Sequence, residues 1–151
     1  MSKLRYSDKK MDDLKKQFDN DFSRYNQHIK SFPEYINEIL AGETETSFSK
    51  KTGLSPNMLN RITKYVCRND PPQRSTIMSI AVGYNLDYQI TSKLLESLGL
   101  GYILSNPRDY AYQFLLTNCR GLTVDECNDV LDILGIEEKY FLGAHARKTK
   151  L

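Results

Sequence analysis

The 151-residue sequence predicts an all-α fold. Apolar residues recur at spacings of three and four along most of the chain, which places them on one face of a helix. Ser, Thr, Asp or Asn precedes several of these segments and Gly follows them, as expected of N-caps and C-caps. No stretch of any length alternates apolar and polar residues as a half-buried strand does.

Length and composition are those of an ordinary globular chain. Hydrophobic residues make up 40% and charged residues 26%, which suits one domain or a small domain with appendages. No apolar run approaches the ~20 residues of a membrane span, and the N-terminus lacks the apolar stretch of a secretory signal. Cys67, Cys119 and Cys127 are dispersed, without CxxC spacing, so we expect reduced thiols. These observations predict a cytoplasmic protein that does not bind a membrane.

The first 31 residues are expected to form an amphipathic helix. From Ser7 to Lys30 the apolar residues recur at helical spacing, while Lys and Asp fill the other faces. Such a stripe must be buried, and two partners remain open: the rest of the same chain or a second copy. The stripe consists of Met11, Leu14, Phe18, Phe22, Tyr25 and Ile29.

A second helix is expected to begin after Ser31. Ser31 is an N-cap residue, and Glu34 three positions later completes the pattern of a capping box. Pro33 lies in the first turn, where its missing N–H costs no hydrogen bond. The helix then buries Tyr35, Ile36, Ile39 and Leu40.

Two short helices that meet at a fixed angle are expected between residues 44 and 65. Thr44 is the expected N-cap of the first helix, which brings Phe48 inward. Gly53 takes the turn, because a residue without Cβ adopts positive φ at no steric cost. Leu54 fills the corner between the two helices.

The second helix of this pair is the main candidate for function. Ser55 is its expected N-cap and Pro56 its expected first residue, and Leu59 and Ile62 are expected to be buried. A short helix held on a scaffold with a polar, basic outer face is typical of a helix-turn-helix that enters the major groove of DNA. The outer face here consists of Pro56, Asn57, Asn60, Arg61 and Lys64.

The C-terminal half contains a repeated helical hairpin. Helices are expected over residues 74–84 and 87–98, and the same signals recur 36 residues later. A repeat of this kind predicts stacked hairpins, each covering the apolar face that its neighbour exposes. The matched positions include Pro71 and Pro107, Asp87 and Thr123, Leu95 and Leu131, and Gly99 and Gly135.

Charge is distributed unevenly, although the net charge is only +2. Residues 45–75 carry six basic and two acidic side chains, whereas residues 107–135 carry two basic and five acidic ones. A basic centre beside an acidic C-terminal part favours an orientation in which the centre faces a polyanion such as nucleic acid. Simple solvation of charged faces produces the same distribution, so that alternative remains open.

Together these motifs resemble the lambda-repressor-like (Cro/CI, or Xre-type) helix-turn-helix family. The likeness rests on Phe48, on the run Lys50-Lys51-Thr52-Gly53-Leu54-Ser55, and on Leu59 and Ile62. It implies a five-helix DNA-binding domain over residues 32–101. An N-terminal amphipathic helix over residues 1–31 precedes this domain, and a C-terminal helical hairpin with a basic tail follows over residues 102–151.

The resemblance also implies roles for individual residues. Outward residues at the start of the recognition helix contact base edges, here Pro56, Asn57 and Arg61, with Asn60 nearby. Asn bonds adenine and Arg bonds guanine in a bidentate way, which fits these positions. Phosphate contacts, which position the domain without reading sequence, are expected from Lys50, Lys51, Ser55, Lys64 and Arg68.

The implied function is a sequence-specific transcriptional regulator that binds double-stranded DNA as a homodimer. One recognition helix contacts too few base pairs to discriminate within a genome, so a second copy is expected. The dimer surface is either the apolar stripe between Met11 and Ile29 or the C-terminal hairpin.

A protein-interaction module on the same scaffold remains the alternative. Glu45 places a carboxylate where the family commonly has a phosphate-binding Gln, and Pro56 offers no donor at a position that often reads a base. In this alternative a partner protein binds the acidic C-terminal hairpin or the N-terminal helix.

Enzymatic motifs are absent from the sequence. His28 and His145 have no carboxylate or cysteine at triad or ligand spacing, and there is no HExxH, GxSxG or glycine-rich phosphate loop. We therefore expect neither an enzyme nor a bound metal or cofactor.

Overall fold

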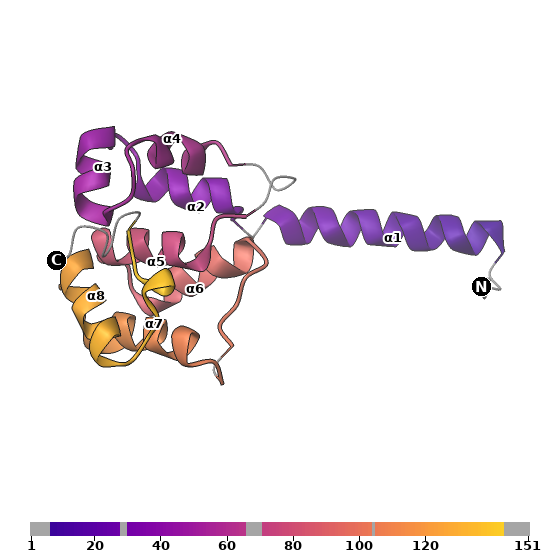
Figure 1. The fold of residues 1–151 in the computed structure, drawn as a ribbon. Coiled ribbons are helices and arrows are strands. Elements are labelled where there is room, and N and C mark those ends of the chain that lie inside the picture. Colours follow the sequence, from indigo (N-terminus) through magenta and orange to yellow (C-terminus); the bar gives the residue numbers. More distant parts are fainter. Residues whose placement is uncertain (1–6, 28–29, 66–70, 104, 144–151) are drawn as a thin grey trace. The chain divides into compact units, whose positions relative to one another are not determined.

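A computed structural model describes residues 7–27, 30–65, 71–103 and 105–143. Within these ranges the secondary structure is entirely helical, with no strand, which confirms the all-α prediction (Figure 1). The chain divides into two compact units, residues 1–31 and 32–151. The helices are α1 (Asp8–Gln27), α2 (Phe32–Ile39), α3 (Glu45–Thr52), α4 (Asn57–Thr63), α5 (Arg74–Gly83), α6 (Tyr88–Ser97), α7 (Pro107–Asn118), α8 (Val124–Ile133) and the 3₁₀ helix η1 (Glu138–Tyr140).

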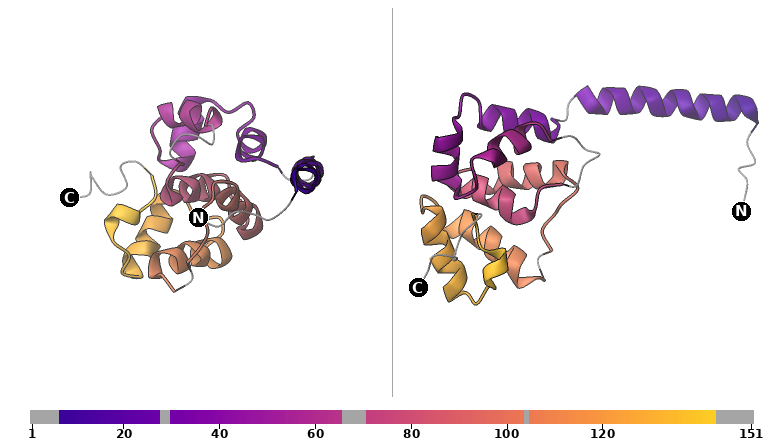
Figure 2. Two further views of the ribbon diagram at one scale, coloured as in Figure 1. Left: turned by 90° about the vertical axis from the view of Figure 1, so that its right-hand side faces the viewer. Right: turned by 45° about the horizontal axis from the view of Figure 1, so that its top comes forward.

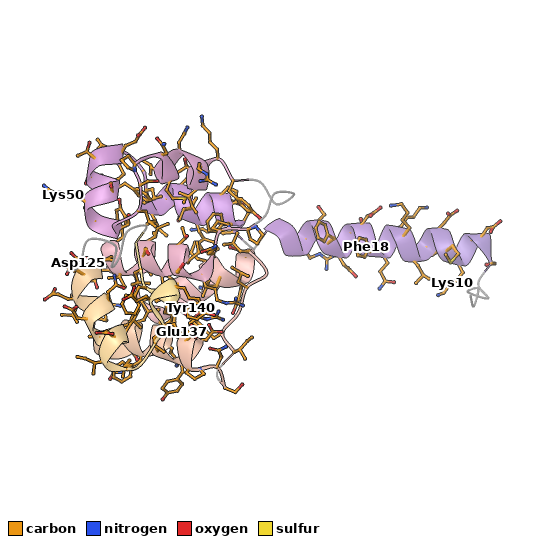
Figure 3. All side chains as sticks on the ribbon, in the orientation of Figure 1. Lys10, Phe18, Lys50, Asp125, Glu137 and Tyr140 are labelled. Carbon is orange, nitrogen blue, oxygen red and sulfur yellow. The ribbon has the colours of Figure 1, made fainter. Side chains whose placement is uncertain are left out.

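The described part of the first unit contains helix α1, which covers residues 8–27 of the helix predicted from Ser7 to Lys30. The described members of its apolar stripe are exposed, and Lys10 and Phe18 project from the helix in Figure 3. The rings of Phe18 and Phe22 stack with their centroids 5.9 Å apart. Ile29 and the side chain of Tyr25 lie outside the described residues. The exposed members of the stripe are Met11, Leu14, Phe18 and Phe22.

The second unit has three layers of helices. Helices α5 and α6 lie in the middle, with α2, α3 and α4 on one side and α7 and α8 on the other (Figures 1 and 2). The core between the first two layers contains apolar side chains from α2 through α6. Its buried members are Phe32, Ile36, Leu40, Phe48, Leu54, Ile62, Ile77, Ile80, Leu94 and Leu95.

Helix α5 belongs to two cores at once. Ile77 and Ile80 face the first core, whereas Met78 and Ala81 face a second core shared with α7 and α8. Every residue from Ile77 to Ala81 is buried, which is the pattern of a helix packed on all sides. The other buried members of the second core are Ala111, Tyr112, Leu115, Leu116, Val124, Cys127, Leu131, Phe141 and Leu142.

The hairpins α5–α6 and α7–α8, over which the repeat is predicted, end in the same way. Gly99 and Gly135 have φ of 74° and 79°, in the left-handed region that favours glycine. The residue after each glycine bonds the preceding helix. The N–H of Leu100 donates to the carbonyl of Leu95 at 2.8 Å, and the N–H of Ile136 donates to the carbonyl of Leu131 at 3.0 Å. The caps match as well, since Asp87 accepts from the N–H of Ile90 and Thr123 forms a complete capping box with Glu126.

A short segment after η1 ties the C-terminal hairpin to the middle of the unit. The side chain of Asn128 on α8 accepts from the N–H of Leu142 at 2.7 Å and donates to its carbonyl at 2.9 Å. The N–H of Gly143 donates to Ser79 Oγ on α5 at 2.8 Å. Gly143 also lies so close to Gly53 that a Cβ on Gly53 would meet Gly143 Cα at 3.3 Å. The second hairpin therefore contacts the turn between α3 and α4.

Candidate nucleic-acid interface

The turn between α3 and α4 is fixed by glycine and by two side chains. Gly53 has φ of 73°, and its N–H donates to the carbonyl of Ser49 at 2.8 Å, as the sequence predicts for a left-handed C-cap. Thr52 is fully buried; its Oγ1 donates to the carbonyl of Phe48 and accepts from the N–H of Leu54. Ser49 Oγ donates to the Leu54 carbonyl at 2.7 Å. These bonds hold the corner in one conformation, so the angle between the two helices is preset.

The roles of Ser49 and Thr52 were missed by sequence reasoning. Both residues occupy ordinary helix positions, where Ser and Thr commonly bond the preceding turn of the same helix. What distinguishes these two residues is their position near the C-terminal end of α3. From there each side chain bonds the backbone of Leu54, which lies beyond the end of the helix.

The start of α4 differs from its prediction. The helix begins at Asn57 rather than Pro56, and Ser55 does not cap it. Pro56 has helical φ and ψ of −56° and −35° and occupies the cap position itself. The N–H of Met58 donates to the carbonyl of Ser55 at 3.0 Å, so the first turn closes through the backbone and leaves the Ser55 hydroxyl without that role.

The predicted outer face of α4 is exposed. Asn57, Asn60, Arg61 and Lys64 all face solvent, and Pro56 is exposed beside them. The opposite face fixes the helix, because Ile62 is buried in the first core and Leu59 packs against it. Two amides and two cations are therefore presented together on a helix whose other side is anchored.

The surroundings of α4 differ in charge on its two sides. Arg61 borders a hollow of about 400 Å³ together with Tyr65 and Gln73, and none of the described residues in its wall is acidic. Asn60 borders a hollow of about 270 Å³ whose wall includes Glu43 and Glu45. An anion is therefore favoured on the Arg61 side, and the Asn60 side is suited to an uncharged group such as a base edge.

The two lysines of α3, Lys50 and Lys51, differ in whether their charge is paired within the protein. Lys50 is exposed and projects outward from the helix (Figure 3). Lys51 Nζ lies 3.0 Å from Glu43 Oε2 and 4.9 Å from the centre of the Tyr84 ring, so its charge is engaged within the molecule. Lys50 is thus the better placed of the two for a phosphate contact.

Glu43 is held in its ionised form by two donors. Tyr84 donates its hydroxyl to Glu43 Oε2 at 2.5 Å, and Lys51 bonds the same oxygen. The hydrogen bonds from Tyr84 and then Lys51 lower the pKa of Glu43 from 4.5 to about 2. The carboxylate thereby joins the α2–α3 loop to α3 and α5, and it places a negative charge beside the Lys51 ammonium group.

Two further predicted positions, Ser55 and Glu45, differ in exposure. Ser55 is half-buried at the corner, and Glu45 is exposed as the first residue of α3. Arg68 and Cys67 lie outside the described residues.

Cys119 and Cys127 are free thiols, and burial raises the pKa of Cys127 to about 12. Where side chains are described, no three His, Cys, Asp or Glu residues group as a metal site.

Comparison of the chain with protein-family models, with curated proteins and with solved structures gives no match. No described helix combines the length and apolar character that a membrane crossing needs. The site must therefore be interpreted from its own geometry.

Proposed function

We propose that this protein is a sequence-specific DNA-binding regulator of the lambda-repressor-like type, in which α4 enters the major groove. The observation that carries the proposal is the exposed face of α4, with Asn57, Asn60 and Arg61 held on a preset corner. Asn and Arg are the side chains that read adenine and guanine through paired hydrogen bonds. In this proposal α2 to α6 form the five-helix DNA-binding domain.

Phosphate contacts are assigned by exposure. Lys50 on α3 and Lys64 at the end of α4 flank the base-reading face, and both are exposed. Lys51 contributes less in this proposal, because Glu43 already pairs with it at 3.0 Å. Ser55 and Arg68 belong to the proposed set through the family resemblance alone, because Ser55 is half-buried and Arg68 lies outside the described residues.

We propose that the regulator acts as a dimer through α1. Its stripe leaves Phe18 65% and Phe22 56% exposed, an apolar surface that a second copy of the same helix can cover. Two copies present two recognition helices, which doubles the number of base pairs read.

A random DNA pool tests the proposal. Selection by the full-length protein is expected to yield one recurrent motif. The selected duplex and a shuffled one are then titrated against three proteins: wild type, Arg61→Ala and Lys50→Ala. Arg61→Ala is expected to lose about 1–3 kcal/mol of discrimination between the two duplexes. Lys50→Ala is expected to weaken both about equally, because a phosphate contact carries no sequence information.

The result that contradicts this proposal is equal binding to both duplexes by wild type and Arg61→Ala. Raising the salt concentration supplies a second check, since each lost phosphate contact reduces the salt dependence of binding. Lys93→Ala on the exposed surface of α6 is a matched control that removes one charge away from α3 and α4.

A protein-interaction module is the second candidate, and the end of α8 favours it. Ile133, the last residue of α8, is 83% exposed, and Leu134 directly after it is 44% exposed. The helix itself carries Asp125, Glu126, Asp129 and Asp132. An apolar tip on an acidic helix suits a basic partner protein with an apolar pocket. Recovery of one stoichiometric partner, lost on Ile133→Asp, together with no DNA binding at low salt, is the outcome that this candidate predicts.

A further inference from the structure

A cavity of about 480 Å³ lies where the start of α5, the start of α7 and η1 meet. Its volume falls within the range of about 300–1,000 Å³ that is typical of small-molecule pockets. Three cationic side chains line it: Arg74, Arg108 and Lys139. Among the residues that the structure describes, none in its wall is acidic.

The two arginines are held in place and still have donors to offer. Arg74 uses its Nε to donate to the carbonyl of Gly101 at 3.1 Å. Arg108 uses its Nε to donate to Asp109 Oδ1 at 2.8 Å, and Asp109 is fully buried and also accepts from the N–H of Ile103. A guanidinium has five N–H donors, so each arginine keeps most of them after these bonds.

The charge balance at the cavity is positive. Asp109 offsets Arg108, and Glu137 lies 3.6 Å from Lys139, but that pair is exposed and therefore weak. No carboxylate is bonded to Arg74 in the part of the chain that the structure describes. Among the described residues, the positive charge of Arg74 therefore has no carboxylate partner, which favours an anion in the cavity.

Apart from the polar residues Gln73 and Ser75, the rest of the wall consists of proline, leucine and tyrosine side chains. The ring of Tyr140 lies beneath both Arg108, whose Cζ is 5.0 Å from the ring centre, and Lys139, whose Nζ is 5.1 Å away. The buried hydroxyl of Tyr112 donates to the carbonyl of Tyr140 at 2.6 Å and fixes η1 there. Leu100 and Pro72 also line the cavity and supply apolar contact area near this ring.

We propose that this cavity binds a small phosphate monoester that carries a planar ring. The phosphate is a near-dianion at neutral pH, which suits three cations better than a single negative charge does. Arginine forks bond phosphate oxygens in pairs, and Lys139 adds a point charge. The ring occupies the surface formed by Tyr140, Leu100 and Pro72.

The position of the cavity connects it to the helix-turn-helix. Tyr140 leads directly into the segment 141–143, which Asn128 and Ser79 anchor and which lies against Gly53. A ligand that bridges Arg74 on α5 to Lys139 on η1 therefore stabilises the segment that supports the turn between α3 and α4. The binding step itself does not depend on the DNA-binding proposal.

Calorimetric titration of the full-length protein tests this inference with three probes. Phenyl phosphate carries both features, inorganic phosphate carries only the charge, and phenol carries only the ring. Phenyl phosphate is expected to bind with a Kd below about 1 mM and at least about tenfold more tightly than either other probe. Saturable binding of phenyl phosphate no tighter than that of inorganic phosphate overturns the ring part of the inference.

Four variants keep the test specific. Arg74→Gln and Lys139→Gln are each expected to weaken phenyl phosphate binding by about threefold or more, and the double variant by about tenfold. Lys93→Gln on α6 removes one exposed charge outside the cavity and is expected to change nothing. Arg108 is left intact because removing it strands the buried Asp109 carboxylate.

Three outcomes overturn the inference as a whole, and the first two are failures of binding or of its dependence on the cavity. These two are the absence of saturable binding up to about 10 mM and an affinity that the double variant leaves unchanged. The third is displacement of phenyl phosphate by a short DNA duplex, which assigns the anion to the DNA backbone instead of a small molecule. The phenyl phosphate titrations themselves contain no DNA, so their result stays readable if the DNA-binding proposal fails.

Discussion

Individual residues set the geometry of the α3–α4 corner. Gly53 takes the left-handed conformation and lies against Gly143, while Thr52 and Ser49 bond the backbone of Leu54. The corner is therefore constrained from within by side chains and from outside by the C-terminal segment. A change at Gly53 affects both constraints at once.

Replacing Gly53 by Ala is expected to destabilise the protein more than the same change at Gly42. Both glycines have φ of 73°, so each variant loses about 1–2 kcal/mol to the left-handed conformation. Gly42 has nothing within 4 Å of an added Cβ, whereas at Gly53 the Cβ meets Gly143 Cα at 3.3 Å. Urea denaturation measures the difference, and equal losses would show that the contact with Gly143 contributes nothing.

Glu43 makes a pH-dependent contribution to stability. Its folded-state pKa of about 2 lies below the ordinary value of 4.5, because Tyr84 and Lys51 bond the ionised form. The stabilisation is therefore present above about pH 4.5 and is lost as the pH falls toward 2. We expect Glu43→Gln to be less stable than wild type at pH 7, with a difference that shrinks steadily below pH 4.5.

Thermal unfolding of wild type and Glu43→Gln between pH 2.5 and 7 measures this effect. Glu45→Gln is the matched control, since Glu45 is exposed at the first turn of α3. A difference between Glu43→Gln and wild type that stays constant across this pH range refutes the assignment.

At the scale of elements, local signals predicted the helices well and long-range contacts poorly. Thr44, Asp87 and Thr123 were recognised as caps because a cap bonds a backbone N–H three residues away. The anchoring of residues 141–143 could not be predicted in this way. Asn128 bonds Leu142 across 14 positions, and such a distance leaves no local pattern.

The Asn128 side chain is expected to be essential for the anchored segment. Asn128→Ala leaves the N–H and the carbonyl of the fully buried Leu142 without these partners, which costs about 2–4 kcal/mol. Asn118→Ala, at the exposed end of α7, is the control and is expected to cost less than about 0.5 kcal/mol. Chemical denaturation compares the two, and similar losses contradict the anchoring role.

At the scale of the whole molecule, α5 connects the two cores of the second unit. Its residues Ile77 and Met78 point to opposite cores, so the two hairpins cannot separate without exposing apolar surface. The sequence predicted the hairpin repeat from the matched glycines and caps. It did not reveal the cavity, because Arg74, Arg108 and Lys139 come from three separate segments.

The exposed face of α4 was predicted from the sequence, whereas the partner of Lys51 was not. The periodic burial of Leu59 and Ile62 was enough to place Asn57, Asn60 and Arg61 on the outer face. The pairing of Lys51 with Glu43 was not predicted, since it depends on how the α2–α3 loop folds back onto α3. Side-chain partners of this kind follow from tertiary structure alone.

The proposed dimer has its own test in the first unit. Phe18→Glu combined with Phe22→Glu is expected to convert a dimer into a monomer, because both rings belong to the exposed stripe of α1. Asn20→Glu combined with Ser23→Glu adds the same charge away from that stripe and is expected to remain dimeric. Sedimentation equilibrium measures the mass, and a monomeric wild type contradicts the dimer.

Methylation interference on the selected duplex tests the central claim most directly. N7 of guanine lies in the major groove, where Arg61 is proposed to bond it. Methylation of at least one guanine is expected to block wild-type binding and to leave the residual binding of Arg61→Ala unaffected. Interference patterns that are identical for the two proteins, or that show no sensitive guanine, would contradict the proposal that the outer face of α4 reads DNA.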